Sequence, residues 1–493
     1  MNELNWSVAQ PEVLLLVAAC VVALADLFVE DEQRRPTYWL TQASLALVGL
    51  LHWNAYEAGA TAYGMSGMFV ADPMGHLLAA FASGAMMVTI AYARPYIGAR
   101  EMLKGEFFTL SMFVLLGICV MISANNFLVV YLGLEVMSLS LYALVALRRD
   151  HGTSTEAAMK YFVLGALASG FLLYGLSMIY GATGSLQLKE VSDAIAAGQL
   201  NRTVLTFGIV FVVSGLAFKL GVVPFHMWVP DVYHGAPTAV TLMIGGAPKL
   251  AAFAMTLRLL VEGMFGLAVD WQQMLVVLSV CSLVIGNLAA IAQTNLKRML
   301  AYSTIAQMGF MLLAMSAGVV NDNPLSAGNA YSSAMFYAIT YVLTTLGSFG
   351  LVMYLSRQGF ECDELSDLAG LARRSPWLAG VMTIFMFSLA GVPPMVGFYA
   401  KLAVVQALVT TGVAFYIGLA VVAVMLSLIG AFYYLRVVKV VWFDEPTSGA
   451  SAVQSAGLTA LLAVNGLAVL GFGLMPGGLM AICRDAIART LST

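Results

Sequence analysis

The sequence predicts an all-α, polytopic membrane protein with about fourteen transmembrane helices, and three observations lead to this prediction. First, 61% of the 493 residues are hydrophobic, 10% are charged and the mean hydropathy is +0.88, which is more apolar surface than a soluble fold can bury. Second, apolar stretches of about 20 residues follow one another with short connections. Third, lysine and arginine gather on alternate connections, as the positive-inside rule requires.

The apolar stretches fill the whole chain, and no polar block between them is large enough to fold alone. Arg34 and Arg35 follow the first stretch and no positive residue precedes it, which is the reverse of a secretory signal. We therefore interpret it as a retained span and treat 1–493 as a single membrane domain. The predicted spans lie near 11–29, 37–55, 73–93, 106–122, 126–147, 156–180, 203–229, 237–258, 271–292, 299–318, 330–355, 376–408, 413–435 and 453–482.

Charge counting gives the orientation and separates out the unusual residues. One set of alternate connections carries 14 lysines and arginines and the other carries 5, so both termini are predicted to lie outside, with an even number of spans. The remaining four of the 23 basic residues are lysines inside predicted spans. An acid inside a span, in "VVYLGLEVMSLSLYALVAL", joins them. These five residues are Glu135, Lys160, Lys219, Lys249 and Lys401.

A charge near the middle of a bilayer costs about 2.5 to 3.5 kcal/mol on insertion scales. A single intramembrane lysine often reaches the interface or forms a structural ion pair, but four lysines and a glutamate on separate helices favour an ion or proton path. Lysine suits such a path because burial lowers the pKa of a lysine, whereas a nearby carboxylate raises it. Moving the acid would then load or unload the lysine.

The first predicted helix break lies in "AFKLGVVPFHMW", residues 217–228. Pro224 has no N–H for the carbonyl of Leu220, and Gly221 lets the chain unwind beside it. Irregular backbone at membrane depth is tolerated only where protein buries it or where it lines a wet cavity. Lys219 is thus expected beside freed carbonyls, and His226 is a candidate proton relay after the break.

The second predicted break lies in "MFSLAGVPPMVGFYAKL". Pro393 and Pro394 free the carbonyls of Leu389 and Ala390, and Lys401 follows two helical turns after Pro394, on the same face. The glycines before the breaks, Gly221 and Gly391, are 170 residues apart. Because an odd number of spans separates the copies, the two halves are predicted to be inverted repeats, which is typical of transporter ion pathways.

Other polar residues have weaker claims. His234, in "VPDVYHGAPT", lies at the end of a span, where a mouth for proton entry and a simple interfacial loop both remain open. Arg258 is near a helix end and is expected to extend its side chain to the interface. Ser303, Thr304 and Gln307 are expected to bond to neighbouring helices.

Several classes of function are disfavoured. The five cysteines never form a CxxC or a Cys/His cluster, so we expect no metal and no iron–sulfur ligation. We find no phosphate-binding glycine motif, which argues against a nucleotide site. The net charge of −3 gives no reason to expect nucleic-acid binding.

Three motifs identify a resemblance. "KLGVVPFHMWVPDVYHGAPT", "NLKRMLAYSTIAQMG" and "LAGVPPMVGFYAK" closely resemble the antiporter-like membrane subunits of the proton-pumping NADH:quinone oxidoreductase, respiratory complex I, which are related to Mrp-type cation/proton antiporter subunits. The likeness spans nearly the whole chain. It implies three leading spans in 1–105, a first five-helix unit in 106–262, an inverted second unit in 263–445 and a last span in 446–493.

The resemblance also implies roles. Glu135 and Lys219 would be the coupling ion pair, Lys249 the central relay and Lys401 the terminal donor or acceptor, with Lys160 as a secondary candidate. NADH, FMN, iron–sulfur clusters and quinone would be bound by sibling subunits, so this chain would hold no redox centre. Its partners would be the other complex I subunits, above all the neighbouring membrane-arm subunits, together with lipid, water and protons.

The expected function is therefore proton translocation, coupled to quinone reduction elsewhere in a redox enzyme complex. The expected location is the bacterial inner (cytoplasmic) membrane, with both termini on the periplasmic side. The alternative is an Mrp-like secondary cation/proton antiporter subunit. A purely structural membrane scaffold is disfavoured by the free-energy cost of the buried charges.

Overall fold

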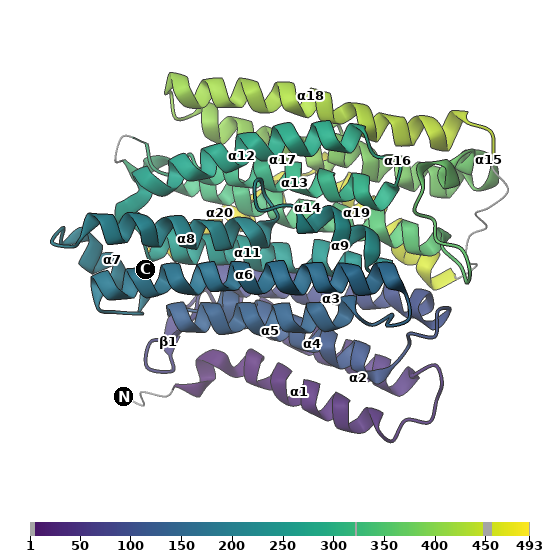
Figure 1. Ribbon diagram of the computed structural model, residues 1–493, viewed down its shortest axis with the longest axis horizontal. Coiled ribbons are helices and arrows are strands. Elements are labelled where there is room, and N and C mark those ends of the chain that lie inside the picture. Colours follow the sequence, from purple (N-terminus) through teal and green to yellow (C-terminus); the bar gives the residue numbers. More distant parts are fainter. Residues whose placement is uncertain (1–4, 321–322, 447–455, 493) are drawn as a thin grey trace.

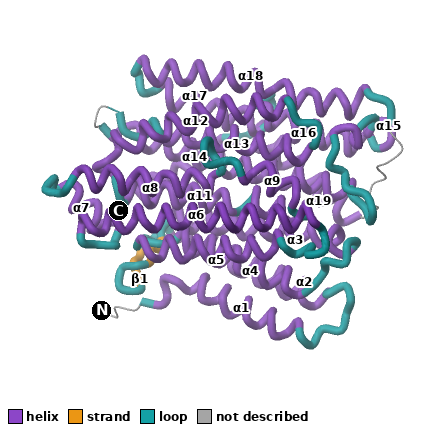
Figure 2. The backbone as a smooth tube through the Cα atoms, viewed as in Figure 1, coloured by secondary structure: helices purple, strands orange, loops and turns teal. Residues whose placement is uncertain are grey.

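The computed structural model describes residues 5–320, 323–446 and 456–492, which form a bundle of helices lying side by side. Figure 1 shows α1 (Gln10–Asp26) at one edge of the bundle and α18 (Ala414–Phe443) at the opposite edge. The first and the last described residues lie at the same end of the bundle (Figure 1). Loops gather at the two ends (Figure 2).

The amino-terminal part places three long helices beside a small hairpin. Strands β1 and β2 pair antiparallel, Ala62 opposite Ala71. The all-α prediction missed this hairpin because three-residue strands are too short to show alternation in sequence. Asp72 then caps the next helix by accepting from the Gly75 N–H at 3.0 Å. The elements are η1 (Trp6–Ala9), α1, α2 (Arg35–Ala58), β1 (Ala62–Gly64), β2 (Phe69–Ala71) and α3 (Pro73–Gly98).

The middle part contains the first broken helix. Its elements are α4 (Gly105–Ile122), α5 (Phe127–Val145), α6 (Gly152–Thr183), α7 (Leu188–Ala196), α8 (Arg202–Leu220), α9 (Trp228–Gly235), α10 (Thr238–Gly245), α11 (Pro248–Thr256) and the π-helix η2 (Leu257–Glu262). The sequence predicted one helix over 237–258. The structure instead interrupts it after Gly245, where Gly246 has the non-helical angles φ −96° and ψ −117°.

The last part contains the second broken helix. Its elements are η3 (Phe265–Leu267), α12 (Ala268–Ile291), α13 (Leu296–Met315), η4 (Pro324–Ser326), α14 (Ala327–Leu355), η5 (Leu365–Leu368), α15 (Leu371–Arg374), α16 (Pro376–Ala390), α17 (Val396–Val409), α18, α19 (Ala456–Leu474) and α20 (Gly477–Leu491). The start of the span predicted at 453–482 lies outside the described residues.

Eleven helical segments among the described residues are long and apolar enough to cross a membrane. The three predicted spans that are missing from this set have physical explanations. Helix α2 carries an arginine, a histidine and a glutamate, and α13 carries Lys297, Arg298 and Gln307, which lower their hydropathy. The span predicted at 376–408 is divided into α16 and α17, each apolar but shorter than 18 residues.

Helix α14 lies at the centre of the bundle. It packs against α3, α10, α11, α13, α16, α17, α19 and α20, and nearly all of its side chains are buried. Its neighbours come from every part of the chain, so the two broken helices are held in one packed unit.

Candidate functional site

The first break begins where α8 ends. Gly221 adopts φ +76°, a left-handed conformation that favours glycine, and a Cβ there would lie 2.6 Å from Val229. The carbonyl of Leu220, predicted to be left free by Pro224, accepts a hydrogen bond from Lys249 Nζ at 2.9 Å. Lys249 is 1% exposed. The freed carbonyl was expected beside Lys219, but the lysine that binds it comes from α11.

Lys219 points to a different partner. Its Nζ donates to Ser138 Oγ on α5 at 2.6 Å, and its side chain is buried. Among the ion pairs of the described residues, Lys219 and Glu135 do not lie within 4.0 Å of each other, so their coupling stays a prediction. Glu135 lies one turn before Ser138, close enough to act on Lys219 electrostatically. Its Oε1 is buried, with no hydrogen-bond partner in the described part of the chain.

A small cavity separates the two lysines of the first break. It measures about 10 Å³ and is lined by Lys219, Lys249, Trp228 and Tyr161 among other residues. This volume is close to the smallest space that holds one water molecule, about 10 to 15 Å³. Trp228 is held in place because its Nε1 donates to the carbonyl of Phe218 at 3.0 Å and its ring stacks on Tyr161. Most of the other residues that line the cavity are apolar, so Lys219 and Lys249 are its charged groups.

At the second break, too, a lysine binds carbonyls freed by proline. Here the lysine lies on the helix segment that directly follows the break. Gly391 ends α16 with φ +86°, and the carbonyls of Leu389 and Ala390 are free of helical partners as predicted. Lys401 Nζ donates to these two carbonyls at 3.0 and 2.9 Å and to Ser427 Oγ at 2.9 Å. Lys401 of α17 therefore reaches back across the break to the carbonyls that end α16.

A chain of hydroxyl and amide groups reaches Lys401 from α13. Gln307 Nε2 donates to the carbonyl of Leu389 at 3.0 Å, the same carbonyl that Lys401 uses, and to Tyr434 OH at 3.0 Å. Tyr337 OH donates to Gln307 Oε1, and Ser303 bonds to Tyr434. A second cavity of about 10 Å³ lies beside Gln307. Bonding to neighbouring helices was expected here, but direct contact with the second break was not.

The secondary candidates lie nearer the surface of the chain. The Lys160 side chain lies in the candidate span Gly152–Thr183, is 42% exposed in the isolated chain, and bonds to Asp231 at 2.7 Å and to Glu156 at 2.8 Å. Asp231 also pairs with Arg298 at 2.8 Å. His226 and His234 are half-buried, and in the described residues neither has a hydrogen bond to the buried lysines. His226 Nδ1 is buried without a partner there.

Arg258 corrects another expectation. It does not extend to the interface, because its side chain is 1% exposed and bonds to Asp72 at 2.5 Å and to Glu262 at 2.7 Å. Its Nε donates to the carbonyl of Ile122 at 3.1 Å. A cavity of about 630 Å³ lies beside this cluster, at the end of the bundle near the last residues of α20. Where the structure describes the chain, no three His, Cys, Asp or Glu residues gather as a metal site.

Residues 124–427 match a family model described as "NADH:quinone oxidoreductase/Mrp antiporter, TM". The NADH-quinone oxidoreductase subunit N of Herminiimonas arsenicoxydans is 61% identical over 497 aligned residues and covers 100% of both chains. That of Polaromonas naphthalenivorans is also 61% identical, covering 99% of this chain and 98% of its own.

Solved structures agree with the sequence relatives. A chain of respiratory complex I from Thermus thermophilus with bound aureothin superposes with a TM-score of 0.79 at 31% identity, covering 96% of this chain and 98% of its own. A chain of the Mrp complex from Dietzia sp. DQ12-45-1b gives 0.82 at 22% identity, covering 98% of this chain and 97% of its own. At this identity the second likeness is one of fold alone.

Proposed function

This chain belongs to the NADH:quinone oxidoreductase/Mrp antiporter family, in which it is a subunit N, the antiporter-like, proton-translocating subunit of the complex I membrane arm, and we propose that protons cross it through Glu135, Lys219, Lys249 and Lys401. The chain is thus part of an enzyme complex, NADH-quinone oxidoreductase. Redox cofactors belong to sibling subunits in this proposal. FMN, iron–sulfur clusters, NADH and quinone are all bound outside this chain.

One observation carries the proposal: at each helix break, a lysine side chain binds the freed carbonyls. Lys249 binds Leu220 at 2.9 Å, and Lys401 binds Leu389 and Ala390 at 3.0 and 2.9 Å. Carbonyls accept hydrogen bonds but cannot donate them. They therefore hold the charged lysine, and they can accept from water once the lysine has given its proton away.

The switch at the first break is electrostatic. Glu135 is within electrostatic reach of Lys219 without touching it, so a small movement of either side chain changes how firmly Lys219 holds a proton. Driving one proton against about 150 to 200 mV needs roughly 3.5 to 4.6 kcal/mol. That corresponds to roughly a thousandfold change in proton affinity, within the range that burial and a carboxylate produce together.

The relay then runs from the first break to the second. The small cavity between Lys219 and Lys249 supports transfer through one water molecule. The chain of Gln307, Tyr337 and Tyr434 supports the last stage, because Gln307 shares the Leu389 carbonyl with Lys401. Lys160, His226 and His234 are secondary relay candidates.

We place this relay in fourteen spans, with inverted units over 106–262 and 263–445. Residues 1–105 precede the units and 446–493 follow them. The charge bias over the connections and the position of both chain ends at one end of the bundle support periplasmic termini. A periplasmic reporter fused to the carboxyl end tests this orientation. Neighbouring membrane-arm subunits are the proposed partners.

The test compares two lysines in the assembled complex. Lys249→Ala removes the central proton carrier and should lower NADH-driven proton pumping per assembled complex by about tenfold. If no other subunit pumped, loss of a proton-transfer group would cost at least about a hundredfold. Lys104→Ala is the matched control, because Lys104 is exposed. Pumping is measured with a pH-sensitive dye in inverted membrane vesicles.

The Lys104→Ala complex should pump normally. An assembled Lys249→Ala complex that pumps as fast as the unmodified one would remove Lys249 from the path.

A further inference from the structure

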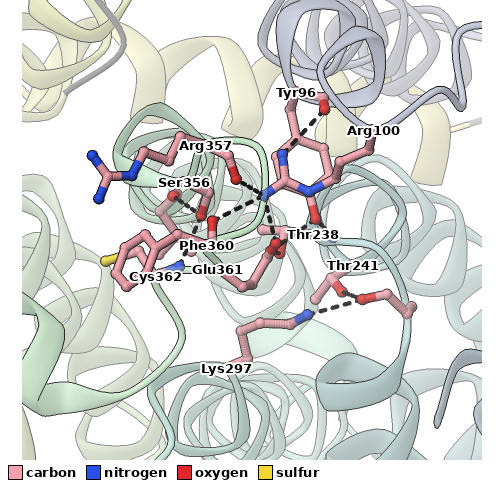
Figure 3. Close-up of polar contacts among 12 residues, drawn as sticks. Tyr96, Arg100, Thr238, Thr241, Lys297, Ser356, Arg357, Phe360, Glu361 and Cys362 are labelled. Carbon is pink, nitrogen blue, oxygen red and sulfur yellow. Dashed lines mark hydrogen bonds and ion pairs between the residues drawn. The ribbon is translucent and has the colours of Figure 1, made fainter. Parts of the chain in front are cut away.

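A partly buried polar cluster lies at the end of the bundle where α3 ends and α13 begins. Its centre is the carboxylate of Glu361, in the connection after α14. Glu361 Oε1 accepts from Tyr96 OH at 2.8 Å and from Thr238 Oγ1 at 2.5 Å. Glu361 Oε2 pairs with Arg100 Nη2 at 2.7 Å. Figure 3 shows these side chains converging from separate elements.

Arg100 fixes the connection that carries Glu361. Its Nη2 also donates to the carbonyls of Arg357 and Phe360 at 3.1 and 3.2 Å, and its guanidinium lies 3.8 Å from the centre of the Tyr96 ring. The Arg100 side chain is only 7% exposed. The pair is therefore anchored, unlike an exposed surface ion pair, which contributes little.

The carboxylate stays charged at working pH. Burial acts to raise the pKa of Glu361, but the charges of Lys297 and Arg100 and the bonds from Thr238 and Tyr96 hold that pKa below its usual range. The stabilisation is complete above the ordinary glutamate pKa of about 4.3 and is lost only as the pH falls through the lowered value. Substitution is thus the way to remove it.

The cluster holds the turn that joins α9 to α10. Thr238 begins α10, and its N–H donates to Tyr96 OH at 3.1 Å while its hydroxyl donates to Glu361. Lys297 Nζ donates to the carbonyl of Ala236, two residues earlier, at 2.9 Å (Figure 3). Side chains from helix α3, helix α13 and the connection after α14 therefore all form hydrogen bonds with this one turn.

Along the chain, that turn lies between Leu220, whose carbonyl accepts the hydrogen bond, and Lys249, whose Nζ donates it. Helix α9 continues from the break that frees the carbonyl of Leu220, and α10 leads into α11, which carries Lys249. A hydrogen bond at 2.9 Å weakens steeply when its groups move apart, and small misplacements of reacting groups are costly to proton transfer. Residues 236–238 thus lie on the segment that joins the Leu220 carbonyl to Lys249 along the chain.

We propose that Glu361 is a positioning residue for the proton relay: through Thr238 and Tyr96 it fixes the α9–α10 turn and thereby sets Lys249 against the carbonyl of Leu220. The inference rests on the proposed role of Lys249. It also joins the two units, because Glu361 lies in the second and Lys249 in the first.

The test uses the intact complex and four variants. Glu361→Gln removes the charge that Arg100 pairs with, and Thr238→Val removes the hydroxyl while keeping the shape. Both should lower pumping per assembled complex by about threefold to tenfold. Thr238→Ser keeps the hydroxyl and should restore pumping. Asp363→Asn removes one charge from the same connection, and pumping should remain near normal.

If Glu361→Gln and Thr238→Val reduce only the amount of assembled complex, and each assembled complex still pumps normally, then these residues serve stability alone and the proposal is overturned. Equal losses for Thr238→Ser and Thr238→Val, or for Asp363→Asn and Glu361→Gln, would also overturn it. Lys249→Ala separates the two proposals. If its assembled complex pumps normally, the relay itself fails. If it loses pumping while Glu361→Gln does not, only the positioning role fails.

Discussion

The three lysines of the proposed relay differ in how many acceptors the chain gives them. Lys401 Nζ has three, two carbonyls and Ser427. Within the described residues, Lys249 has the Leu220 carbonyl and Lys219 has Ser138. An ammonium group carries three N–H bonds, so Lys219 and Lys249 can each bind water while keeping their present contacts. Lys401 must release one of its partners first.

Ser138→Ala tests the contact of Lys219. Leaving a buried charged donor without its acceptor costs about 1 to 3 kcal/mol, so we expect pumping per assembled complex to fall about fivefold to a hundredfold. Ser140→Ala is the matched control, because Ser140 lies on the same helix and its hydroxyl donates only to the carbonyl of Val136. Equal pumping by the two variants would contradict a role for Ser138.

Lys401→Glu tests whether the second break needs a positive charge. A carboxylate in this position would face the carbonyls of Leu389 and Ala390, which are acceptors like itself. We therefore expect Lys401→Glu to lose as much pumping as Lys401→Ala. A Lys401→Glu complex that pumps clearly better than Lys401→Ala would show that any titratable group suffices there.

At the residue scale, the sequence predicts which backbone carbonyls lack a helical partner, but it does not predict which side chains contact one another. The prolines identified the free carbonyls of Leu220, Leu389 and Ala390, because a missing N–H is a local property. Ser138 could not be predicted, since a serine in an apolar span usually bonds to its own helix. The distance between Glu135 and Lys219 could not be predicted either, because it depends on how α5 packs against α8 in the whole bundle.

At the scale of elements, a glycine in the left-handed conformation begins each break. Gly391→Ala tests the second break, because a Cβ there would lie 2.8 Å from Lys401 Cδ and the φ of +86° is strained for alanine. Strain of about 1 to 3 kcal/mol should displace Lys401 and lower pumping per assembled complex several-fold. Dye-based pumping assays in vesicles measure the effect.

Gly380→Ala is the control for this prediction. Gly380 lies in the same helix, and a Cβ there meets nothing within 4 Å. Its complex should assemble and pump normally, with a slight gain in helix stability. Equal behaviour of the two glycine variants would show that the conformation at Gly391 is not needed.

Both functional breaks were predictable, whereas the interruption at Gly245 and Gly246 was not. Proline forces a break wherever it stands in a helix, so the sequence around Pro224 and Pro393 is decisive. A glycine pair only lowers helix propensity, and many membrane helices tolerate it. Here the packing of α10 and α11 against α14 determines the outcome.

At the scale of the whole molecule, the packing around α14 makes the two breaks parts of one unit. Helix α14 contacts both α16 and α17 of the second break and both α10 and α11 beside the first. The Gln307 chain crosses this centre through Tyr337 of α14. The order of the spans could be read from hydropathy, but this central position depends on contacts between distant segments and could not.

The most direct test of the relay is a structure of the assembled complex in which water molecules are resolved. The account predicts a bridging water between Lys219 and Lys249 and a continuous chain of water and side-chain hydrogen bonds from Lys249 through Gln307 to Lys401. A dry, apolar gap between Lys249 and Gln307 that persists in every state of the working complex would contradict it.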